Sequence, residues 1–565
     1  MVETSFTETD SQNGFKNFSP LLKRLLEQRG LLEDQEIENF LNPNYEEHLH
    51  SPHLLNDIQK AADRIIKAVK DKEKILIYSD YDADGIPGAV ILHEFFTAIG
   101  YSNFENYIPH RHMEGFGLHL EAVEGFAEKK VNLIITIDCG TADLEQIALA
   151  RRLGMDVIVT DHHETNGKMS DAFAVVNPKR PDSTYPFPFL CGAAVVFKLI
   201  QVLSEEKSFS WQKGKEKWFL DMVGLATLSD MVPLVGENRI LSFYGLKVLR
   251  KSRRPGLIEL FRNLGIDQKY LSEDDVTFMI TPRINAASRM DRPEDAFRLL
   301  ATKDFSEARE TVSHLNKINE ERKGIVASLV KEAKKRLREN KNQANEKIIV
   351  IGNPEWRPSL LGLVANSLVE DFGKPVFLWG RDGENIIKGS CRSDGKMNMI
   401  ALMEKIKDNF IEFGGHKMAG GFSVSFEKIH TLSLAMQAVC EGVSPDNSLK
   451  DLETETEEKL LLGEVSWETF RTIDQLSPFG VGNPKPLFFI ENVEIESLRE
   501  FGKQSKHLEI SFIDSNVKAT RFFMDKKKSS LNPGDKVNLK AYLEKSSFQR
   551  KTQLRLKVKD VSICE

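Results

Sequence analysis

The sequence predicts an α/β protein in which a parallel-sheet domain is joined by a long helix to a smaller α/β domain, followed by a C-terminal β-barrel. Three observations predict this class. Between residues 74 and 163, short apolar runs alternate with helical segments, as in βαβ units. Residues 305–340 form one helical pattern with charges on several faces, which suits a bridge between domains. After residue 486, alternating runs are spaced like the strands of a small barrel.

Bulk properties limit the class of protein. At 565 residues the chain is too long for one core, since domains average about 150 residues. No apolar run reaches the about 20 residues that cross a bilayer, and the polar, acidic N-terminus lacks a signal pattern. The five cysteines form no C-x-x-C pair, which argues against a disulfide framework or a zinc ribbon. We therefore expect a cytoplasmic protein with reduced thiols.

Local sequence patterns predict the boundaries of each domain and of its helices and strands. The predicted parts are an N-terminal helical segment (1–54), the parallel-sheet domain (55–304), the connecting helix (305–344), the second α/β domain (345–442), an acidic linker (443–459) and the barrel (460–565). In the first domain, strands at 74–78, 131–138 and 155–163 enclose helices at 87–100 and 141–154. In the barrel, the predicted strands are 487–497, 507–513, 517–524, 535–544 and 553–563.

Charge is distributed unevenly along the chain. The formal net charge is −7, yet residues 501–560 carry fifteen Lys and Arg against six Asp and Glu. A basic module on an acidic protein is compatible with binding a phosphate backbone. A solvated lysine-rich surface is the alternative.

Three carboxylates follow the first predicted strand. Asp80, Asp82 and Asp84 occupy alternate positions before Gly85, and such close like charges repel unless a cation holds them. An EF-hand loop also begins in this way, but it needs a Glu where this chain has Ile91, and a helix where this chain has a strand. For the triplet alone, a solvated acidic turn remains open.

Further polar residues close the other elements of this domain. Asp138 ends the second strand, Asp161, His162 and His163 end the third, and Asp230 follows an apolar helical stretch. The carboxyl ends of parallel strands share one edge of a sheet, so these side chains should converge. Carboxylates with imidazole and no thiolate select Mg²⁺ or Mn²⁺.

The number of carboxylates favours two ions, since one would leave negative charge uncompensated. Two ions about 4 Å apart form the clamp used for phosphodiester hydrolysis, one activating water and the other stabilising the leaving oxygen. Adjacent strand residues point to opposite faces, so we expect one histidine of the pair to be a ligand and the other to face substrate or act in acid–base chemistry.

These motifs resemble a known family. YSDYDADG, TIDCGT, TDHHE and SDMVPL are similar to the four motifs of the DHH phosphoesterase superfamily, and GGHKMAGGFSV is similar to the glycine-rich motif of its associated DHHA1 domain. PRINAASRM, GSCRS and PFGVGNPKPLF resemble segments of the RecJ family of bacterial exonucleases. The resemblance runs from about residue 18 to the C-terminus.

The resemblance implies roles for individual residues. Residues that hold or order the metals would be Asp80, Asp82, Asp84, Asp138, His162 and Asp230. Asp161 and His163 would complete the catalytic centre, with His163 nearest the scissile phosphate. Residues that contact DNA would be Arg111, Arg283, Asn285, Arg289, Ser390, Arg392 and His416. Where the family commonly has His, this chain has Arg357, which keeps a donor but fixes its charge.

The implied activity is a metal-dependent 5′-to-3′ exonuclease that degrades single-stranded DNA to mononucleotides in DNA repair and recombination. The terminal strands would form an OB-fold, which binds single strands through a basic groove and aromatic stacking. Implied partners are a single-stranded-DNA-binding protein and a helicase, and the protein would be a monomer. The alternatives are a phosphodiesterase of short oligonucleotides or cyclic dinucleotides, and a replication scaffold that has lost its metal site.

Overall fold

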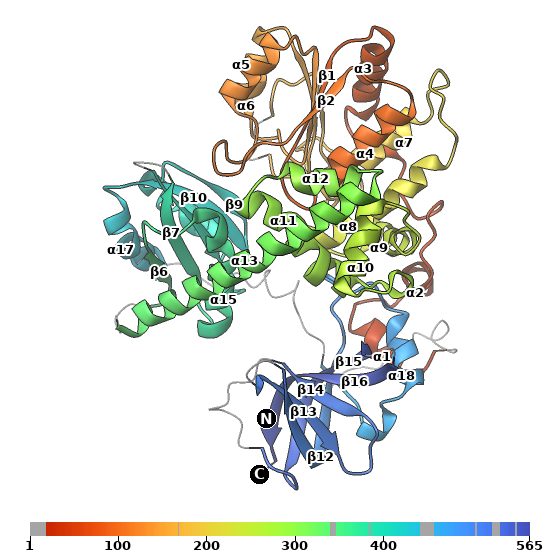
Figure 1. Cartoon of the computed structure of the whole chain (residues 1–565), viewed down its shortest axis with the longest axis vertical. Coiled ribbons are helices and arrows are strands. Elements are labelled where there is room, and N and C mark those ends of the chain that lie inside the picture. The colour runs from red at the N-terminus through yellow and green to blue at the C-terminus, as the bar shows by residue number, and fades with distance from the viewer. Residues whose placement is uncertain are drawn as a thin grey trace, which may run out of the picture. The chain divides into compact units, whose positions relative to one another are not determined.

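A computed structural model describes residues 18–564, apart from 166, 168, 340–345, 383–385, 441–456, 503–504, 523–530 and 549–550 (Figure 1). The chain divides into two units. The sheet unit comprises His50–Val232 and Leu241–Glu453, and the barrel unit comprises Met1–Leu49, Pro233–Ile240 and Thr454–Glu565. Across the described ranges, no helix combines the length and the apolar character that a bilayer crossing requires.

The sheet unit begins with a fully parallel sheet. Its strands lie in the order β2-β1-β3-β4-β5, with bounds β1 (Ile75–Ser79), β2 (Phe104–Tyr107), β3 (Leu133–Ile137), β4 (Asp156–Thr160) and β5 (Ala174–Val176). Every residue of β1 and β3 is buried, as expected for strands covered on both faces. The three predicted strands are confirmed. The sequence pattern missed β2, which is short and polar, and β5, which has three residues.

Helices cover both faces of this sheet. Figure 1 shows α5 (Leu120–Glu128) and α6 (Leu144–Arg152) on one side, and α3 (Ile58–Lys70), α4 (Gly85–Ala98) and α7 (Gly192–Leu203) on the other. Apolar side chains of α5 and α6 pack into one cluster with those of β1, β3 and β4. With both faces closed, the carboxyl edge of the sheet is the place left for a ligand.

A helical layer follows the sheet and leads to the long helix. Its helices are α8 (Leu220–Ser229), α9 (Gly236–Leu249), α10 (Pro255–Leu264), α11 (Thr281–Met290), α12 (Glu294–Ala301) and α13 (Phe305–Glu339). The predicted long helix is confirmed as α13. It packs against α10, α11 and α12, and also against α15 (Pro358–Phe372). Near its end, Ala333 and Leu337 enter the core of the second sheet, so α13 bridges two cores.

The second sheet is mixed, with the order β6-β7-β8-β10-β9. Its elements are β6 (Ile349–Gly352), β7 (Val376–Asp382), β8 (Ile386–Arg392), α16 (Met399–Glu404), β9 (Glu412–His416), β10 (Ala419–Ser425) and α17 (Ile429–Cys440). The glycine-rich motif lies in two paired antiparallel strands. Gly414 and Gly415 lie in β9 and pair with Gly421 and Gly420 of β10. A Cβ on Gly415 would lie 2.4 Å from the Ala419 carbonyl oxygen, so close approach of two strands requires glycine there.

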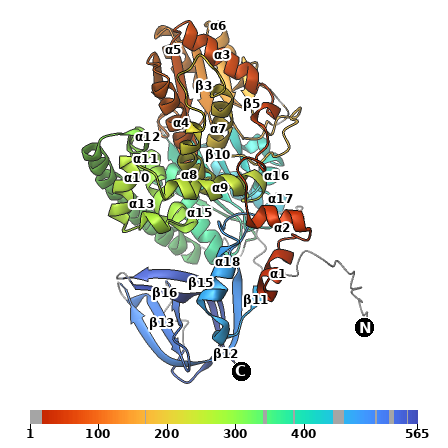
Figure 2. The ribbon, with the colours of Figure 1, turned by 90° about the vertical axis from the view of Figure 1, so that its right-hand side faces the viewer.

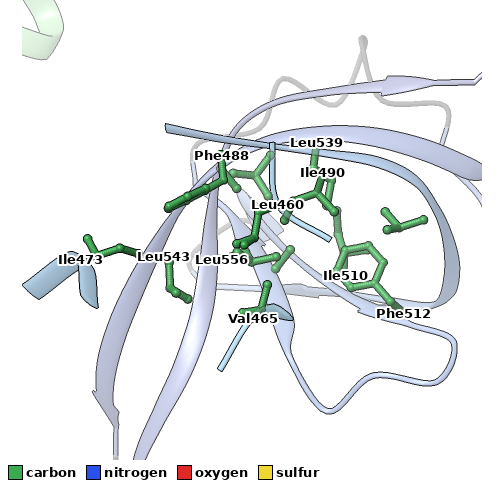
Figure 3. Close-up of a cluster of buried hydrophobic side chains, with 14 of the residues drawn as sticks. Leu460, Val465, Ile473, Phe488, Ile490, Ile510, Phe512, Leu539, Leu543 and Leu556 are labelled. Carbon is green, nitrogen blue, oxygen red and sulfur yellow. The ribbon is translucent and has the colours of Figure 1, made fainter. Parts of the chain in front are cut away.

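The barrel unit contains the predicted C-terminal barrel. Its elements are α1 (Pro20–Glu27), α2 (Asp34–Leu41), β11 (Glu457–Lys459), α18 (Trp467–Asp474), β12 (Leu487–Phe501), β13 (His507–Phe512), β14 (Lys518–Arg521), β15 (Lys536–Phe548) and β16 (Lys551–Ile563). Strands β12-β13-β14-β16-β15 close because β15 also pairs with β12. All five predicted strands are confirmed. Figure 3 shows Phe488, Ile510 and Leu556 filling the interior.

Two details of the barrel unit extend beyond the sequence expectation. The predicted linker ends too late, because its last three residues form β11, which pairs in parallel with β12; residues 443–456 lie outside the described residues. The N-terminal helix α1 contributes Leu22, Leu25 and Leu26 to the barrel core. Figure 2 shows α1 and α18 beside the barrel strands.

Candidate metal centre

The loop after β1 is shaped by hydrogen bonds to its own backbone. The Asp82 carboxylate accepts the N–H groups of Asp84 (2.7 Å) and Gly85 (3.2 Å). The Asp80 N–H donates to the Ile137 carbonyl at 3.0 Å, which continues the sheet ladder into the loop. A Cβ on Gly85 would lie 2.5 Å from the Asp80 carbonyl oxygen, so only glycine lets α4 start this close. The spacing of the motif therefore has a structural cause as well as a chemical one.

Asp84 is held by the first turn of α7. Its two carboxylate oxygens accept the N–H groups of Gly192 (2.6 Å) and Ala193 (2.8 Å). Unpaired N–H groups at a helix start favour an anion. A Cβ on Gly192 would lie 2.7 Å from Cβ of Asp138, so this glycine lets α7 approach the end of β3.

Asp138 and His162 meet at the ends of β3 and β4. His162 Nε2 lies 3.0 Å from Asp138 Oδ1, 3.6 Å from Asp84 Oδ2 and 3.7 Å from Asp230 Oδ2. Asp138 has φ +61°, an uncommon conformation for a non-glycine residue that often marks a functional site. Asp230 follows α8 directly. The predicted convergence of the four polar clusters is thus present in the structure.

Three overlapping groups of side chains have the spacing of metal ligands. Within each group, one ligand atom per residue lies within 4.8 Å of the others. The groups are Asp80 with Asp82 and Asp138, Asp84 with His162 and Asp230, and Asp138 with His162 and His163. Asp138 belongs to the first and third groups, and its Oδ1 lies 3.0 Å from Nε2 of His162, which belongs to the second and third. Both histidines follow β4, which ends at Thr160, so the alternation of a strand does not separate them.

The closely spaced carboxyl groups of this cluster favour the binding of cations. Burial, and then the neighbouring carboxylates, raise the pKa of Asp80, Asp138 and Asp230 well above the usual value, and raise that of Asp84 to about 7. Burial also lowers the pKa of His162, so its ring is neutral and can act as a ligand. Asp80 Oδ1 and Asp138 Oδ1 are buried and accept no hydrogen bond from the described residues. Divalent ions would supply the missing partners, and the donor set suits Mn²⁺ or Mg²⁺.

Asp161 and His163 form a pair beside the cluster. Asp161 accepts the N–H groups of His162 (2.7 Å), His163 (3.2 Å) and Thr141 (3.0 Å), and its Oδ1 lies 2.8 Å from Nδ1 of His163. Burial alone would lower the pKa of His163, but the charge of Asp161 outweighs burial and raises it to about 9. Burial would likewise raise the pKa of Asp161, but His163 lowers it. His163 is therefore cationic, with Asp161 fixing its orientation.

Two asparagines support this centre, and sequence reasoning did not assign either of them this position. The side-chain N–H₂ of buried Asn177, directly after β5, donates to Thr141 Oγ1 and to the His163 carbonyl, both at 2.9 Å. Asn285 was predicted to contact DNA, and its Oδ1 accepts the N–H of Ala83 at 2.9 Å. The signal for Asn177 was a polar residue ending an apolar run, but a three-residue strand is too short to recognise.

Three of the predicted DNA-contacting arginines lie together. Burial, followed by the charges of Arg111 and Arg392, lowers the pKa of Arg289 to about 9. Arg289 donates to the Ser359 carbonyl at 2.9 Å, and Arg111 lies over the Tyr81 ring at 4.9 Å. Mutually repelling guanidinium groups held together form a site for an anion.

The remaining predicted residues are placed in different surroundings. His416 stacks on His163, with ring centroids 5.8 Å apart. Ser390 lies in β8, paired with Gly421 of β10. Arg283 donates to Asn316 Oδ1 of α13 at 2.5 Å, so it is tied to the long helix. Arg357 is exposed at the start of α15.

Family models match three parts of the chain. The "DHH family, N-terminal domain" matches residues 74–227, the "DHHA1 domain" matches residues 345–442, and the "RecJ OB domain" matches residues 456–560. The first of these spans β1 to α8 and contains Asp80, Asp138 and His162.

Known proteins resemble the chain over most of its length. The single-stranded-DNA-specific exonuclease RecJ of Bacillus subtilis is 32% identical over 555 residues, covering 97% of this chain and 69% of that protein. RecJ of Haemophilus influenzae is 30% identical, and the match covers 87% of this chain and 86% of that protein. The crystal structure of Thermus thermophilus RecJ in complex with Mn²⁺ matches with a TM-score of 0.78 and 27% identity, over 97% of this chain and 76% of that one. The chain belongs to the RecJ family.

Proposed function

We propose that this protein is a metal-dependent exonuclease that degrades single-stranded DNA from the 5′ end to mononucleotides. The observation that carries the proposal is the cluster of Asp80, Asp82, Asp84, Asp138, His162 and Asp230, which brings carboxylates and an imidazole together at the spacing of metal ligands. Relatives of the same architecture are named single-stranded-DNA-specific exonucleases, and one was crystallised with Mn²⁺.

We assign Asp80, Asp82 and Asp138 to one Mn²⁺ or Mg²⁺ ion, and Asp84, His162 and Asp230 to a second; the two groups adjoin where Asp138 Oδ1 lies 3.0 Å from His162 Nε2. When bound, the two ions would activate water and stabilise the leaving oxygen in phosphodiester hydrolysis. His163, held cationic by Asp161, would lie against the scissile phosphate and stabilise its developing negative charge.

The arginine cluster would hold the strand. Arg111, Arg289 and Arg392 supply planar donor groups that suit phosphate oxygens, and His416 and Ser390 would add donors at the 5′ end. The closed barrel would bind the strand further on, as OB-folds do through basic grooves and stacked aromatic rings. Phe522 is a candidate there, because its half-buried ring carries the Arg555 guanidinium at 5.2 Å.

Setting and partners form part of the same proposal. All five cysteines are thiols, outside any disulfide, which fits the reducing cytoplasm. We propose that the protein acts as a monomer in repair and recombination, on strands exposed by a helicase and coated by a single-stranded-DNA-binding protein.

The test uses Mn²⁺ and one single-stranded oligonucleotide labelled at either the 5′ or the 3′ end, beside a blunt duplex and a cyclic dinucleotide. We expect immediate release of a labelled mononucleotide from the 5′ label only, with the duplex intact. The Asp82→Ala variant, prepared in parallel, excludes a contaminating nuclease. Cleavage of the dinucleotide alone would replace the proposal with a small-substrate phosphodiesterase, and no cleavage would favour a scaffold.

A further inference from the structure

Phe116 is a large apolar side chain left in solvent beside the proposed catalytic centre. It is 52% exposed. Its ring centroid lies 5.5 Å from that of His163, at an interplanar angle of 67°. Because the ring is half exposed and lies beside His163, it offers an aromatic face to a bound ligand.

The loop that carries this ring, residues 110–118, is held on both sides of it. Before Phe116, the Glu114 carboxylate accepts the hydroxyl of Tyr107 (2.5 Å) and the N–H of His110 (2.6 Å). After Phe116, the Gly117 carbonyl accepts the Tyr78 hydroxyl (2.6 Å), and the Leu118 N–H donates to Asp143 (2.8 Å). Two of these hydrogen bonds tie the loop to β2 and β1, one ties it to the start of α6, and one lies within the loop.

The two glycines beside Phe116 set the direction of the ring. Gly115 has φ +91° and Gly117 has φ +81°, conformations that other residues rarely adopt. A Cβ on Gly117 would also lie 2.6 Å from Asp143 Oδ1. The backbone conformation at these two glycines therefore fixes the direction of the Phe116 ring, which lies against His163.

We propose that Phe116 is the stacking platform for the base of the 5′-terminal nucleotide of single-stranded DNA. This inference rests on the proposed function. Arg111, in the same loop, belongs to the arginine cluster that would bind phosphate. A base is joined to its phosphates through one sugar, so a ring that contacts His163 lies within reach of the base beside the scissile phosphate. Every base has an aromatic face, so such a contact tolerates any sequence.

The kinetic test compares side chains and substrates in pairs. The Phe116→Ala and Phe116→Leu variants remove the aromatic ring, whereas Phe116→Trp keeps one. Met113→Ala is the control, because Met113 lies in the same loop and is 79% exposed. Release of the first nucleotide is measured in single turnovers, with a normal 5′ terminus and with an abasic residue at position 1, 2 or 4. Because the site is exposed, all four variants should melt with the parent protein.

We expect Phe116→Ala to weaken binding of the normal oligonucleotide about 5- to 150-fold, and Phe116→Trp and Met113→Ala to match the parent protein. With the abasic residue at position 1 the parent and Phe116→Ala should become equal, while at positions 2 and 4 the difference should persist. The proposal would be overturned if Phe116→Ala changed release from every oligonucleotide equally, or changed it for none. It would also be overturned if the parent protein and Phe116→Ala became equal only when the abasic residue is at position 2.

A binding measurement separates this proposal from the proposed function. The oligonucleotide carries 2-aminopurine at the 5′ terminus and a phosphorothioate at the first linkage, and Ca²⁺ replaces Mn²⁺. We expect the parent protein to quench the fluorescence and Phe116→Ala to bind without quenching. If the protein quenches the label yet cleaves nothing with Mn²⁺, the exonuclease proposal fails and the stacking site stands. If it cleaves from the 5′ end but both proteins quench equally, the stacking site alone is wrong.

Discussion

The imidazole rings of His163 and His416 stack nearly parallel, with centroids 5.8 Å apart and an interplanar angle of 10°. His163 follows β4 of the parallel sheet, and His416 ends β9 of the second sheet. The two α/β parts of the sheet unit therefore meet at the residue that Asp161 keeps cationic. This contact makes His416 a part of the centre despite a separation of 253 residues in sequence.

Variants of His416 should separate stacking from hydrogen bonding. His416→Phe keeps an aromatic ring against His163 but removes both nitrogen atoms, and His416→Ala removes ring and nitrogens. If His416 binds the 5′ phosphate, both variants should raise KM for single-stranded DNA about tenfold, the usual cost of a lost hydrogen bond to a charged group. If only stacking matters, His416→Phe should retain the activity of the parent protein. Steady-state kinetics on a 5′-phosphorylated oligonucleotide distinguish the two.

Removing the Asp138 carboxylate should disable the metal centre. Asp138 belongs to the group assigned to one ion, and its Oδ1 lies 3.0 Å from Nε2 of His162, which belongs to the group assigned to the other. Asp138→Asn should therefore weaken both ions and lower kcat about 10³-fold, since metal ions contribute several kcal/mol of charge stabilisation. Calorimetric titration with Mn²⁺ should show weaker binding. Glu124→Gln, an exposed residue of α5, is the matched control and should change neither value. Full activity of Asp138→Asn would contradict the ligand assignment.

The metal-free protein should lose stability as the pH rises. An unfolded aspartate has a pKa of 3.8, whereas that of folded Asp84 is raised to about 7, and the other buried carboxyls are raised as well. The folded state therefore keeps protons that the unfolded state releases. The stabilisation that results from this difference in pKa is complete below about pH 4 and is lost as the pH rises through about 7. We expect the melting temperature in EDTA to fall between pH 5 and pH 8.

Saturating Mn²⁺ should remove most of that slope, because bound cations take over the role of the protons. In EDTA, Asp84→Asn should flatten the profile and melt at or above the parent protein at pH 8. A melting temperature that is independent of pH without metal would show that the carboxylates are not held as charged neighbours.

Arg392 should contribute to DNA affinity through a phosphate. Its side chain packs over Gly362 of α15, where a Cβ would lie 2.7 Å from the guanidinium, and it lies close enough to Arg289 to affect its pKa. Loss of one phosphate contact reduces the salt slope of single-strand binding by about 0.7. We expect that change for Arg392→Ala in fluorescence anisotropy across salt concentrations. Arg338→Ala, on the exposed end of α13, should leave the slope unchanged.

Asn483 should be essential for the stability of the barrel unit. It is fully buried, donates to the carbonyls of Leu476 and Pro478 at 2.8 Å each, and accepts from Arg29 Nε at 2.8 Å. Asn483→Ala leaves these groups unpaired, at about 1–3 kcal/mol for each buried group without a partner. We expect a clear fall in the melting temperature. Asn483→Asp keeps the acceptor for Arg29 but loses both donors, so it should be intermediate if Arg29 matters.

Local sequence determined the elements and the chemistry of this protein. Buried parallel strands appear in the sequence as apolar runs, which made β1, β3 and β4 predictable. The period of a long charged helix predicted α13, and the alternation of apolar and polar residues predicted β12–β16. Because parallel strands present their carboxyl ends at one edge, residues as distant as Asp80 and His162 could be assigned to one cluster. Short strands such as β5 carry too few residues for a period, so Asn177 was missed.

Only the tertiary structure decided the contacts made across the fold. The pairing of Gly414 and Gly415 with β10, the stacking of His416 on His163, and the hydrogen bond from Ala83 to Asn285 join segments whose separation in sequence carries no periodic signal. Phe116 reads in sequence as one more apolar residue. Its exposure beside His163 follows from the anchored loop and two glycines with positive φ, because solvent exposure is a property of the packed chain.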